Sequence, residues 1–337
     1  MSRVLASPSW QVESSSHASL GLGAIMTNYF KTFVTSLNIS DCRVCNFPSL
    51  IFLCGGSLES FQSKPKSARG FYIKHVEENN PELKTKFILA EAINDWYDEN
   101  IYKDLLSFER DLASLSSLTV LFVESAGSIA ELGAFSLLEP INKSLFAIIE
   151  SDKSAERSFI NLGPVRYIKN IREGSIHFYK WEIVTPKNGR EIFFLSEDAI
   201  DLTERILNFH KSLPKELSFV PKNVGHVILF IADVINVLII SKLSEIQIIL
   251  KSLGIPLKER ILNRYVYILQ KLGLVKKVSY SNNDYFVACK DTSYIRYSFQ
   301  PQTSLRDMDK WRTFFQKEYE EHDPRKMRAY RSYLRSK

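Results

Sequence analysis

The chain has 337 residues, which is more than one small domain needs and enough for two. Its composition, 45% hydrophobic and 24% charged, is that of an ordinary globular protein and excludes a fibrous or largely disordered chain. The formal net charge is +6, but residues 201–337 carry 24 Lys and Arg against 14 Asp and Glu, whereas residues 1–200 carry 20 against 24. This asymmetry predicts a neutral or acidic half that does chemistry and a basic half that binds.

The first segment, residues 1–47, is serine-rich and weakly patterned, and it predicts a leader. Met26 could be the true start, because the sequence looks more structured from Tyr29 onward. No basic stretch followed by an apolar core is present there, so we expect no secretory signal and a cytoplasmic protein. Cys42 and Cys45 form a C-x-x-C pair. No second pair or histidine cluster completes a zinc site, so two ordinary thiols are favoured over a metal.

Residues 48–200 alternate apolar runs with amphipathic stretches, which predicts a Rossmann-like parallel α/β sheet. The expected strands are 49–53, 85–89, 118–123 and 145–149. The expected helices are 67–78, 104–114 and one that opens after residue 124 and runs to about 138. In such sheets, ligands bind at the carboxyl ends of the strands. Two glycine loops, Cys54–Ser57 and Glu124–Ser128, and the carboxylate of Glu91 fall at these ends.

After about residue 200 the pattern becomes helical, with helices expected at 199–212, 224–239, 244–251 and 257–272. A hairpin of strands 275–280 and 285–288 follows. This order predicts a winged-helix domain over residues 201–300 and a basic helical tail over 301–337. The apolar run at 227–240 is interrupted by Asp233 and Asn236 and is too short for a membrane span, so it predicts a buried helix.

Cations cluster in the last helix and the hairpin of this unit, at Lys258, Arg260, Arg264, Lys271, Lys276 and Lys277. Tyr280 and Tyr285 accompany them, and basic with aromatic residues suit phosphate contact and base stacking. The pattern therefore favours a nucleic acid or a nucleoprotein as partner. A winged helix that contacts only protein, and a solvated basic tail after Asp323, are the alternatives.

Glu131 is the main candidate for chemistry, because it lies between Gly127 and Gly133 at the expected first turn of a helix that follows a strand. The helix N-terminus would keep its carboxylate ionised. In a cleft, that carboxylate can attack an anomeric carbon. Glu124 could orient the ribose hydroxyls or protonate the leaving base. A glutamate in a first helical turn is also commonly only a capping residue.

The loops around these carboxylates would shape the pocket, through Gly55, Gly56 and Ser57 in one loop and Gly127 and Ser128 in the other. Gly127 would let a ligand approach the backbone, and Gly133 would let the helix pack closely.

Three segments also carry a family resemblance: Ile51-Phe-Leu-Cys-Gly-Gly56, Glu124-Ser-Ala-Gly-Ser-Ile-Ala-Glu-Leu-Gly-Ala-Phe-Ser136 and Arg157-Ser-Phe-Ile-Asn-Leu-Gly-Pro-Val-Arg166. In this order they resemble the effector (toxin) family of bacterial retrons that has a nucleoside-deoxyribosyltransferase-like domain. The winged-helix order and Ser293-Tyr-Ile-Arg-Tyr-Ser-Phe299 extend the resemblance to about residues 48–300.

The resemblance implies a role in anti-phage defence. A reverse transcriptase makes a branched RNA–DNA hybrid, the msDNA, and their complex holds the effector inactive until phage infection releases it. The effector then harms the host, so that the infection aborts. A homo-oligomer or a higher assembly would be compatible with this role.

The same resemblance places the nucleophilic glutamate of the deoxyribosyltransferases at Glu131. Those enzymes have an aspartate where this chain has Glu124, and Glu91 is only a positional candidate for their nucleoside-binding acids. Cleavage of a nucleotide such as NAD is therefore favoured over transfer between free bases. The nucleotide would be a substrate, and we expect neither a cofactor nor a metal.

The third segment adds Asn161 and Arg166, which could hold a phosphate or a ribose hydroxyl because Arg makes bidentate contacts to phosphate. A plain loop at Gly163-Pro164, with Arg166 paired to a carboxylate, stays equally open. For the whole chain the rival hypothesis is a binding module that senses a nucleotide without turning it over and is attached to a DNA-binding regulator. The glycines on both sides of Glu131 favour the enzyme.

Overall fold

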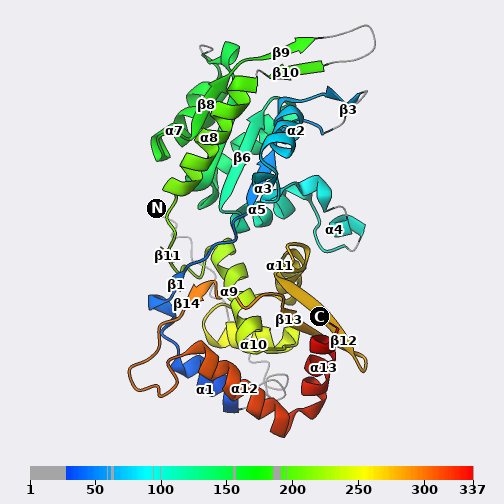
Figure 1. Cartoon of the computed structure of the whole chain (residues 1–337). Coiled ribbons are helices and arrows are strands. Elements are labelled where there is room, and N and C mark those ends of the chain that lie inside the picture. Colours follow the sequence, from blue (N-terminus) through cyan, green and yellow to red (C-terminus); the bar gives the residue numbers. More distant parts are fainter. Residues whose placement is uncertain are drawn as a thin grey trace, which may run out of the picture.

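The computed structural model describes residues 28–58, 60–61, 64–93, 95–98, 100–154, 157–184, 191–194 and 196–336. Within these ranges the chain forms an α/β unit, at the top of Figure 1, and a largely helical C-terminal unit below it. The first 27 residues of the expected leader, and with them Met26, lie outside the described residues.

The α/β unit is built on a five-stranded sheet in the order β5-β2-β6-β7-β8, in which all neighbours are parallel. The strands are β2 (Ile51–Cys54), β5 (Phe87–Ile88), β6 (Leu118–Val123), β7 (Leu145–Glu150) and β8 (Ile176–Tyr179). The prediction of a parallel α/β sheet is confirmed, and β8 is a strand that the apolar runs do not predict. All residues of β2 and β6 are buried, because helices cover both faces of the sheet.

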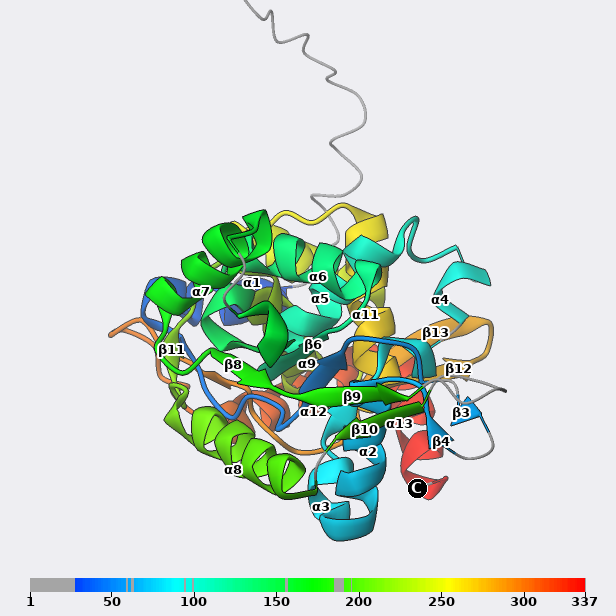
Figure 2. The same ribbon diagram turned by 90° about the horizontal axis from the view of Figure 1, so that it is seen from above.

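Helices pack on each face of this sheet (Figure 2). On one side lie α2 (Ala68–Asn79) and α8 (Ser196–Ser212), which share a core with alternate residues of β2 and β6. On the other side lie α5 (Leu105–Leu115), α6 (Ala126–Leu137) and α7 (Arg166–Ile171). The helix α8, expected as the first helix of the C-terminal half, therefore belongs to the α/β unit, which extends to about residue 212.

The other elements of the α/β unit are short. They are β3 (Ser60–Phe61), β4 (Lys64–Pro65), α3 (Pro81–Lys84), η2 (Ala90–Ala92), α4 (Asp95–Asp98), η3 (Ile141–Ser144), η4 (Ser151–Lys153), η5 (Asn161–Val165), β9 (Trp181–Val184) and β10 (Glu191–Phe194). The strands β9 and β10 form a separate antiparallel pair.

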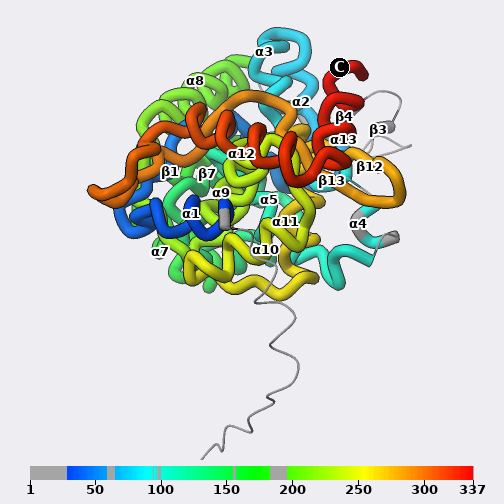
Figure 3. The backbone as a smooth tube through the Cα atoms, turned by 90° about the horizontal axis from the view of Figure 1, so that it is seen from below, coloured from blue at the N-terminus to red at the C-terminus, as the bar shows by residue number. Residues whose placement is uncertain are grey.

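The C-terminal unit is organised around α9 (Val224–Val237), which is almost entirely buried, as the run at 227–240 predicts. Around α9 lie α10 (Leu243–Ser252), α11 (Glu259–Lys271), the hairpin of β12 (Val275–Tyr280) and β13 (Asn283–Ala288), α12 (Met308–His322) and α13 (Pro324–Arg335). Figure 3 shows this arrangement from below. The expected order of helices followed by a hairpin is present, and none of the helices in the described ranges has the length and apolar character that crossing a bilayer requires.

The described part of the expected leader is structured and belongs to the C-terminal unit. The helix α1 (Asn28–Ser36) packs against α10 and α12, and η1 (Ile39–Asp41) follows it. The strand β1 (Arg43–Val44) then lies between β11 (Leu217–Ser218) and β14 (Ile295–Arg296). Residues 28–47 therefore belong to the folded C-terminal unit and not to a leader, in agreement with the more structured pattern expected from Tyr29 onward.

The two units share one apolar core rather than meeting at a polar surface. Phe108 and Leu112 of α5 belong to the same buried cluster as Val227 and Ile228 of α9. At Gly225, a Cβ would lie 2.0 Å from the carbonyl oxygen of residue 114, so the start of α9 approaches the end of α5 too closely for any side chain. The position of α5 is therefore tied to the C-terminal unit.

Candidate active site

The candidate site lies at the carboxyl ends of β2 and β6, the neighbouring strands at the centre of the sheet order. From β2 the chain crosses to β5 on one side, and it then returns past β2 to β6 on the other. Such a change of direction opens a crevice in parallel α/β sheets, and ligands commonly bind there. The two glycine loops expected from the sequence follow these two strands.

The loop after β2 requires its glycines. Gly55 has φ +144°, and a Cβ on it would lie 2.8 Å from the Cβ of Phe122. A Cβ on Gly56 would lie 2.8 Å from the Cδ of Glu124. The tight turn after β2 is therefore packed against the end of β6, while Ser57 at its far end is exposed.

Glu124 holds this loop in place. Its Oε1 accepts hydrogen bonds from the backbone N–H of Gly56 (3.0 Å) and Arg69 (3.1 Å), and its Oε2 accepts one from the N–H of Ala68 (2.6 Å). Burial raises the pKa of Glu124, and these backbone hydrogen bonds oppose the rise. Because both oxygens are engaged by backbone donors, Glu124 is placed as a structural clamp and not as the expected proton donor to a leaving base.

Arg69 is a site residue that the sequence analysis missed. It is almost fully buried at the start of α2, where its Nε donates to the carbonyl of Gly56 (2.8 Å) and its Nη1 to that of Leu53 (3.1 Å). Its Nη2 forms an ion pair with Glu91, whose side chain is 53% exposed. Glu91, expected at a strand end from its position alone, is thus brought to the site by a buried arginine.

The serines of the loop after β6 form hydrogen bonds with the backbone of that same loop. The Ser125 side chain caps α6 by accepting from the N–H of Ser128, and the Ser128 hydroxyl accepts from the N–H of Ser125 (2.8 Å) and of Glu124 (2.9 Å). Ser128 is fully buried, so it shapes the loop and does not face a ligand as expected. Gly127 is exposed, and a Cβ on Gly133 would meet nothing within 4 Å, so close packing does not explain Gly133.

Glu131 lies one turn further along α6 than the sequence analysis expects. Ser125 is the N-cap, so Glu131 is the sixth helical residue and stands beyond the first turn, where the helix N-terminus acts most strongly. Burial raises its pKa to about 7, Arg69 opposes the rise and Glu91 adds to it. The expectation that the helix N-terminus keeps Glu131 fully ionised is therefore wrong. Its Oε2 is buried and has no hydrogen-bond partner among the described residues.

A second buried carboxylate, Glu109 of α5, accompanies Glu131. The pKa of Glu109 is raised to about 7, first by burial and then by the neighbouring charge of Glu131. The buried thiol of Cys54 feels both carboxylates, since burial first and then their charges raise its pKa. The sequence held one signal for Glu109, because it lies next to Phe108 within the apolar pattern of α5.

Asn161 is the first residue of η5, and Arg166 directly follows that helix. The helix η5 packs against α6 and so lies beside the helix of Glu131. The Asn161 amide donates to the backbone carbonyl of Lys153 (2.7 Å) and thereby fixes the loop after β7. Arg166 is exposed and forms no ion pair with a carboxylate in the described part of the chain. A phosphate-binding role for the two residues stays a prediction.

The six expected cations of the C-terminal unit separate into two groups. Arg264 is buried; its Nη2 is 2.5 Å from Oδ2 of Asp111, and its guanidinium lies over the ring of Tyr102. Lys271 forms an ion pair with Asp95 of α4. Both residues hold α11 against the α/β unit. Arg264 is buried and does not face a nucleic acid as expected, whereas Lys271 is exposed but paired, and its contact with a nucleic acid stays a prediction.

The other four cations are exposed: Lys258, Arg260, Lys276 and Lys277. Lys277 pairs with Asp284 across the hairpin (2.8 Å), and Lys276 lies over the ring of Tyr333. Tyr285 is buried and cannot stack on a base as expected, whereas Tyr280 is partly exposed. The basic surface is therefore smaller than the sequence predicts and is centred on the hairpin and the start of α11.

Metal-binding groups are not formed in the described part of the chain: no three His, Cys, Asp or Glu side chains there are arranged to hold an ion. Cys42 and Cys45 are both free thiols.

Comparison with known proteins identifies the family. The model of the STM3845 retron effector protein family matches residues 65–277. The chain belongs to this retron effector family. The matched segment includes the loop after β6, Glu109, Glu131 and most of the helical core of the C-terminal unit.

Two relatives from Escherichia coli match most of the chain. The protein named "Retron Ec73 putative ribosyltransferase/DNA-binding protein" is 28% identical over 302 residues, which cover 85% of this chain and 89% of the relative. The protein named "Retron Ec86 putative ribosyltransferase/DNA-binding protein" is 24% identical over 286 residues, which cover 77% of this chain and 83% of the relative.

Proposed function

We propose that this retron effector is a toxin that cleaves the N-glycosidic bond of a nucleotide or nucleoside, with NAD as the favoured substrate and Glu131 as the nucleophile. The observation that carries the proposal is the buried, unpartnered Oε2 of Glu131 beside the crevice at the end of β6. Buried polar atoms without partners are rare, and a catalytic role is one of the explanations for such an atom. The family and the word ribosyltransferase in the names of both relatives support the same chemistry.

In the first step, a carboxylate oxygen of Glu131 attacks C1′ of the ribose, and the bond from C1′ to the base nitrogen breaks with its electron pair leaving on the base. From NAD the nicotinamide leaves as a neutral molecule and needs no proton. A purine base leaving from a nucleoside needs one, which protonated Glu109 would donate. The product is a ribosyl ester of Glu131.

In the second step, water attacks C1′ of the ester, its proton passes to the carboxylate of Glu109, and the carboxylate of Glu131 is released. Two coupled carboxylates with pKa values near 7 suit this exchange, because either one can hold or give up a proton at neutral pH. Arg69 would stabilise the ionised forms from its buried position. Hydrolysis then needs no acceptor base.

The partner proposed for the effector is a reverse transcriptase with its msDNA, which would hold the toxin inactive until phage infection. The exposed cations Lys258, Arg260, Lys276 and Lys277 would contact nucleic-acid phosphates. The words DNA-binding in the relatives' names support such a contact. The helix α5 carries Glu109 and also packs against α9 and α11 of the C-terminal unit. A partner bound to the C-terminal unit would therefore act on a helix that carries a residue of the candidate site.

The test is base release by the purified chain, alone and with its reverse transcriptase and msDNA. NAD and a panel of nucleosides and nucleotides are incubated with the protein, and released bases are separated by chromatography. Release that depends on Glu131 supports the proposal and identifies the substrate. Absence of release in every partner state would favour the rival function, a nucleotide-sensing domain attached to a DNA-binding regulator.

A further inference from the structure

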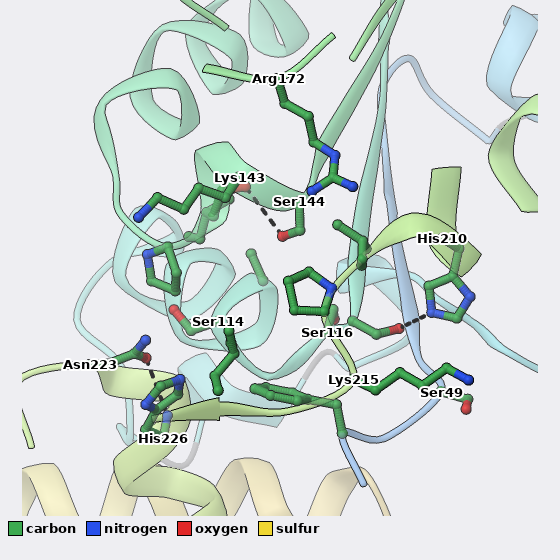
Figure 4. Close-up of a pocket in the computed structure, with 18 of the residues that line it drawn as sticks. Ser49, Ser114, Ser116, Lys143, Ser144, Arg172, His210, Lys215, Asn223 and His226 are labelled. Atoms are coloured by element: carbon green, nitrogen blue, oxygen red, sulfur yellow. Dashed lines mark hydrogen bonds between the residues drawn. The ribbon is translucent and has the colours of Figure 1, made fainter. Parts of the chain in front are cut away.

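A cavity lies at the opposite end of the sheet from Glu131. It has a volume of about 600 Å³ and is bounded by residues that precede β2, β6 and β7, by the ends of α5 and α8, and by the segment leading into α9. Figure 4 shows its lining. The cavity therefore lies between the two units, which is where small-molecule sites often form, and its size is within their usual range.

The lining of this cavity is positively charged. It contains Lys143, Arg172, Lys211 and Lys215 and no aspartate or glutamate. Lys143 pairs with Glu139 at 3.5 Å, but the other three cations form no ion pair with any residue that the structure describes. A concave surface with uncompensated cations attracts an anion.

Arg172 is held in position for such an anion. Its Nη2 donates to the carbonyl oxygen (2.9 Å) and hydroxyl (2.8 Å) of Ser212, and its guanidinium lies over the ring of Phe209. The Nε and Nη1 donors make no hydrogen bond with the described residues, and the side chain reaches into the cavity beside Ser144 (Figure 4). An arginine with a fixed orientation and open donors is suited to a phosphate oxygen.

Apolar side chains form part of the remaining wall, among serines and asparagines, and could receive a flat ring. Phe47, Ile141, Ile171, Leu213 and Leu217 contribute to it. Phe47 is only partly buried and packs against His226. The His226 ring is almost fully buried, and its Nδ1 accepts a hydrogen bond from the N–H of Val220 (3.1 Å). Burial lowers the pKa of His226 to about 4, so the ring is neutral at neutral pH and adds no charge to the cavity.

We infer that this cavity binds a nucleotide, with its phosphates at Arg172, Lys211 and Lys215 and its base against the apolar wall. The site is separate from the proposed catalytic centre and goes beyond the proposed function. Its occupant would contact the α/β unit through Arg172 and the connection to α9 through Lys215, and so would join the two units.

The binding test uses the full chain carrying Glu131→Gln, so that turnover does not consume the ligand. AMP, ADP, ATP and inorganic phosphate are titrated by calorimetry into this protein and into the same protein with Lys211→Glu and Lys215→Glu. Both lysines are exposed, so the fold is expected to survive, and thermal unfolding checks this. We expect at least one nucleotide to bind. Its Kd should be at least about 10-fold higher for the double variant, which corresponds to a loss of about 1.4 kcal/mol of binding free energy.

Lys222→Glu is the matched control, because Lys222 is exposed near the cavity without lining it. Equal weakening by the control would overturn the site, as would unchanged affinity in the double variant or no nucleotide binding at all. Inorganic phosphate binding as tightly as every nucleotide would overturn the role of the apolar wall.

Arg172→Lys keeps the charge and loses the planar donors, so it should weaken nucleotide binding without changing base release by an otherwise wild-type chain. Failure of the catalytic proposal shows in base release and leaves this binding result intact.

Discussion

The α/β unit and the C-terminal unit each gather side chains of one charge, but they hold them differently. In the α/β unit, Glu109 and Glu131 are largely buried near each other, and burial raises both pKa values to about 7. In the C-terminal unit the unpartnered cations, such as Arg260, lie at the surface. Burial therefore creates groups that can exchange protons at neutral pH, whereas exposure creates a surface that attracts phosphate through salt-dependent forces.

Each unit also uses one charged group to hold its structure. Glu124 accepts three backbone hydrogen bonds in the α/β unit, and Arg264 pairs with Asp111 where the C-terminal unit meets α5. A charge held by backbone donors or by a buried counter-charge supports the fold, and a charge without such a partner is available for function. The following predictions test whether the paired charges determine stability and the unpaired charges determine function.

The largest effect is expected at Glu131. Glu131→Gln should reduce base release by about 10³-fold or more, because it removes the nucleophile and keeps nearly the same shape. The control is Glu204→Gln on the exposed surface of α8, which should leave base release unchanged. Chromatography of released base and growth of host cells would measure both variants. A Glu131→Gln protein as active and toxic as the wild type would remove Glu131 as the nucleophile.

Glu109→Gln should reduce base release by about 10²-fold or more, as loss of a general acid or base usually does. The pH profile separates this role from a merely structural one. With NAD, both carboxylates must be ionised at some point of the cycle, so the rate should rise as pH increases through about 7. With a purine nucleoside, protonated Glu109 is needed first, so the rate should also fall at higher pH.

With NAD, Glu109→Gln should leave only the part of the rise that Glu131 controls. With a purine nucleoside it should remove the fall at higher pH and keep the rise that Glu131 controls. Equal loss of rate at every pH, with the shape of both profiles unchanged, would contradict an acid–base role for Glu109.

Glu124→Gln should lower stability before it affects chemistry. The amide keeps one acceptor oxygen but places an N–H₂ group against backbone donors, which should cost about 2 kcal/mol of unfolding free energy. Denaturant unfolding would measure this loss, with Glu204→Gln again as control. If the stability stays unchanged while base release falls, Glu124 is a catalytic group and the clamp interpretation fails.

The smallest effect is expected on the hairpin. Lys276→Glu with Lys277→Glu should weaken binding to the reverse transcriptase–msDNA complex by about 10-fold at low salt, and by less at high salt because salt screens phosphate contacts. Arg264→Ala should instead destabilise the chain, because it leaves Asp111 buried without its partner. Pull-downs across a salt series and thermal unfolding would distinguish the two. Unchanged binding of the hairpin variant at every salt concentration would rule out the hairpin as the contact.

The sequence alone determined the elements whose pattern is local. The buried strand β6, the apolar helix α9 and the position of Glu131 just after a strand all follow from residues that are close in the chain. A period of two or of 3.6 residues, with glycine and polar residues at its ends, is sufficient for these assignments. The parallel arrangement also follows, because strands that alternate with helices pair in this way.

Only the tertiary structure decided which charges are free. Arg264 meets Asp111 across 153 positions of sequence, and Arg69 meets Glu91 across 22. The place of α1 was also decided by tertiary structure, because it packs against α10 and α12, which are far from it in the chain. Pairing and burial depend on residues distant in the chain, and they determine both the pKa of a carboxylate and the availability of a cation. Periodicity could therefore locate Glu131, but only packing could bring Glu109 and Arg69 to its side.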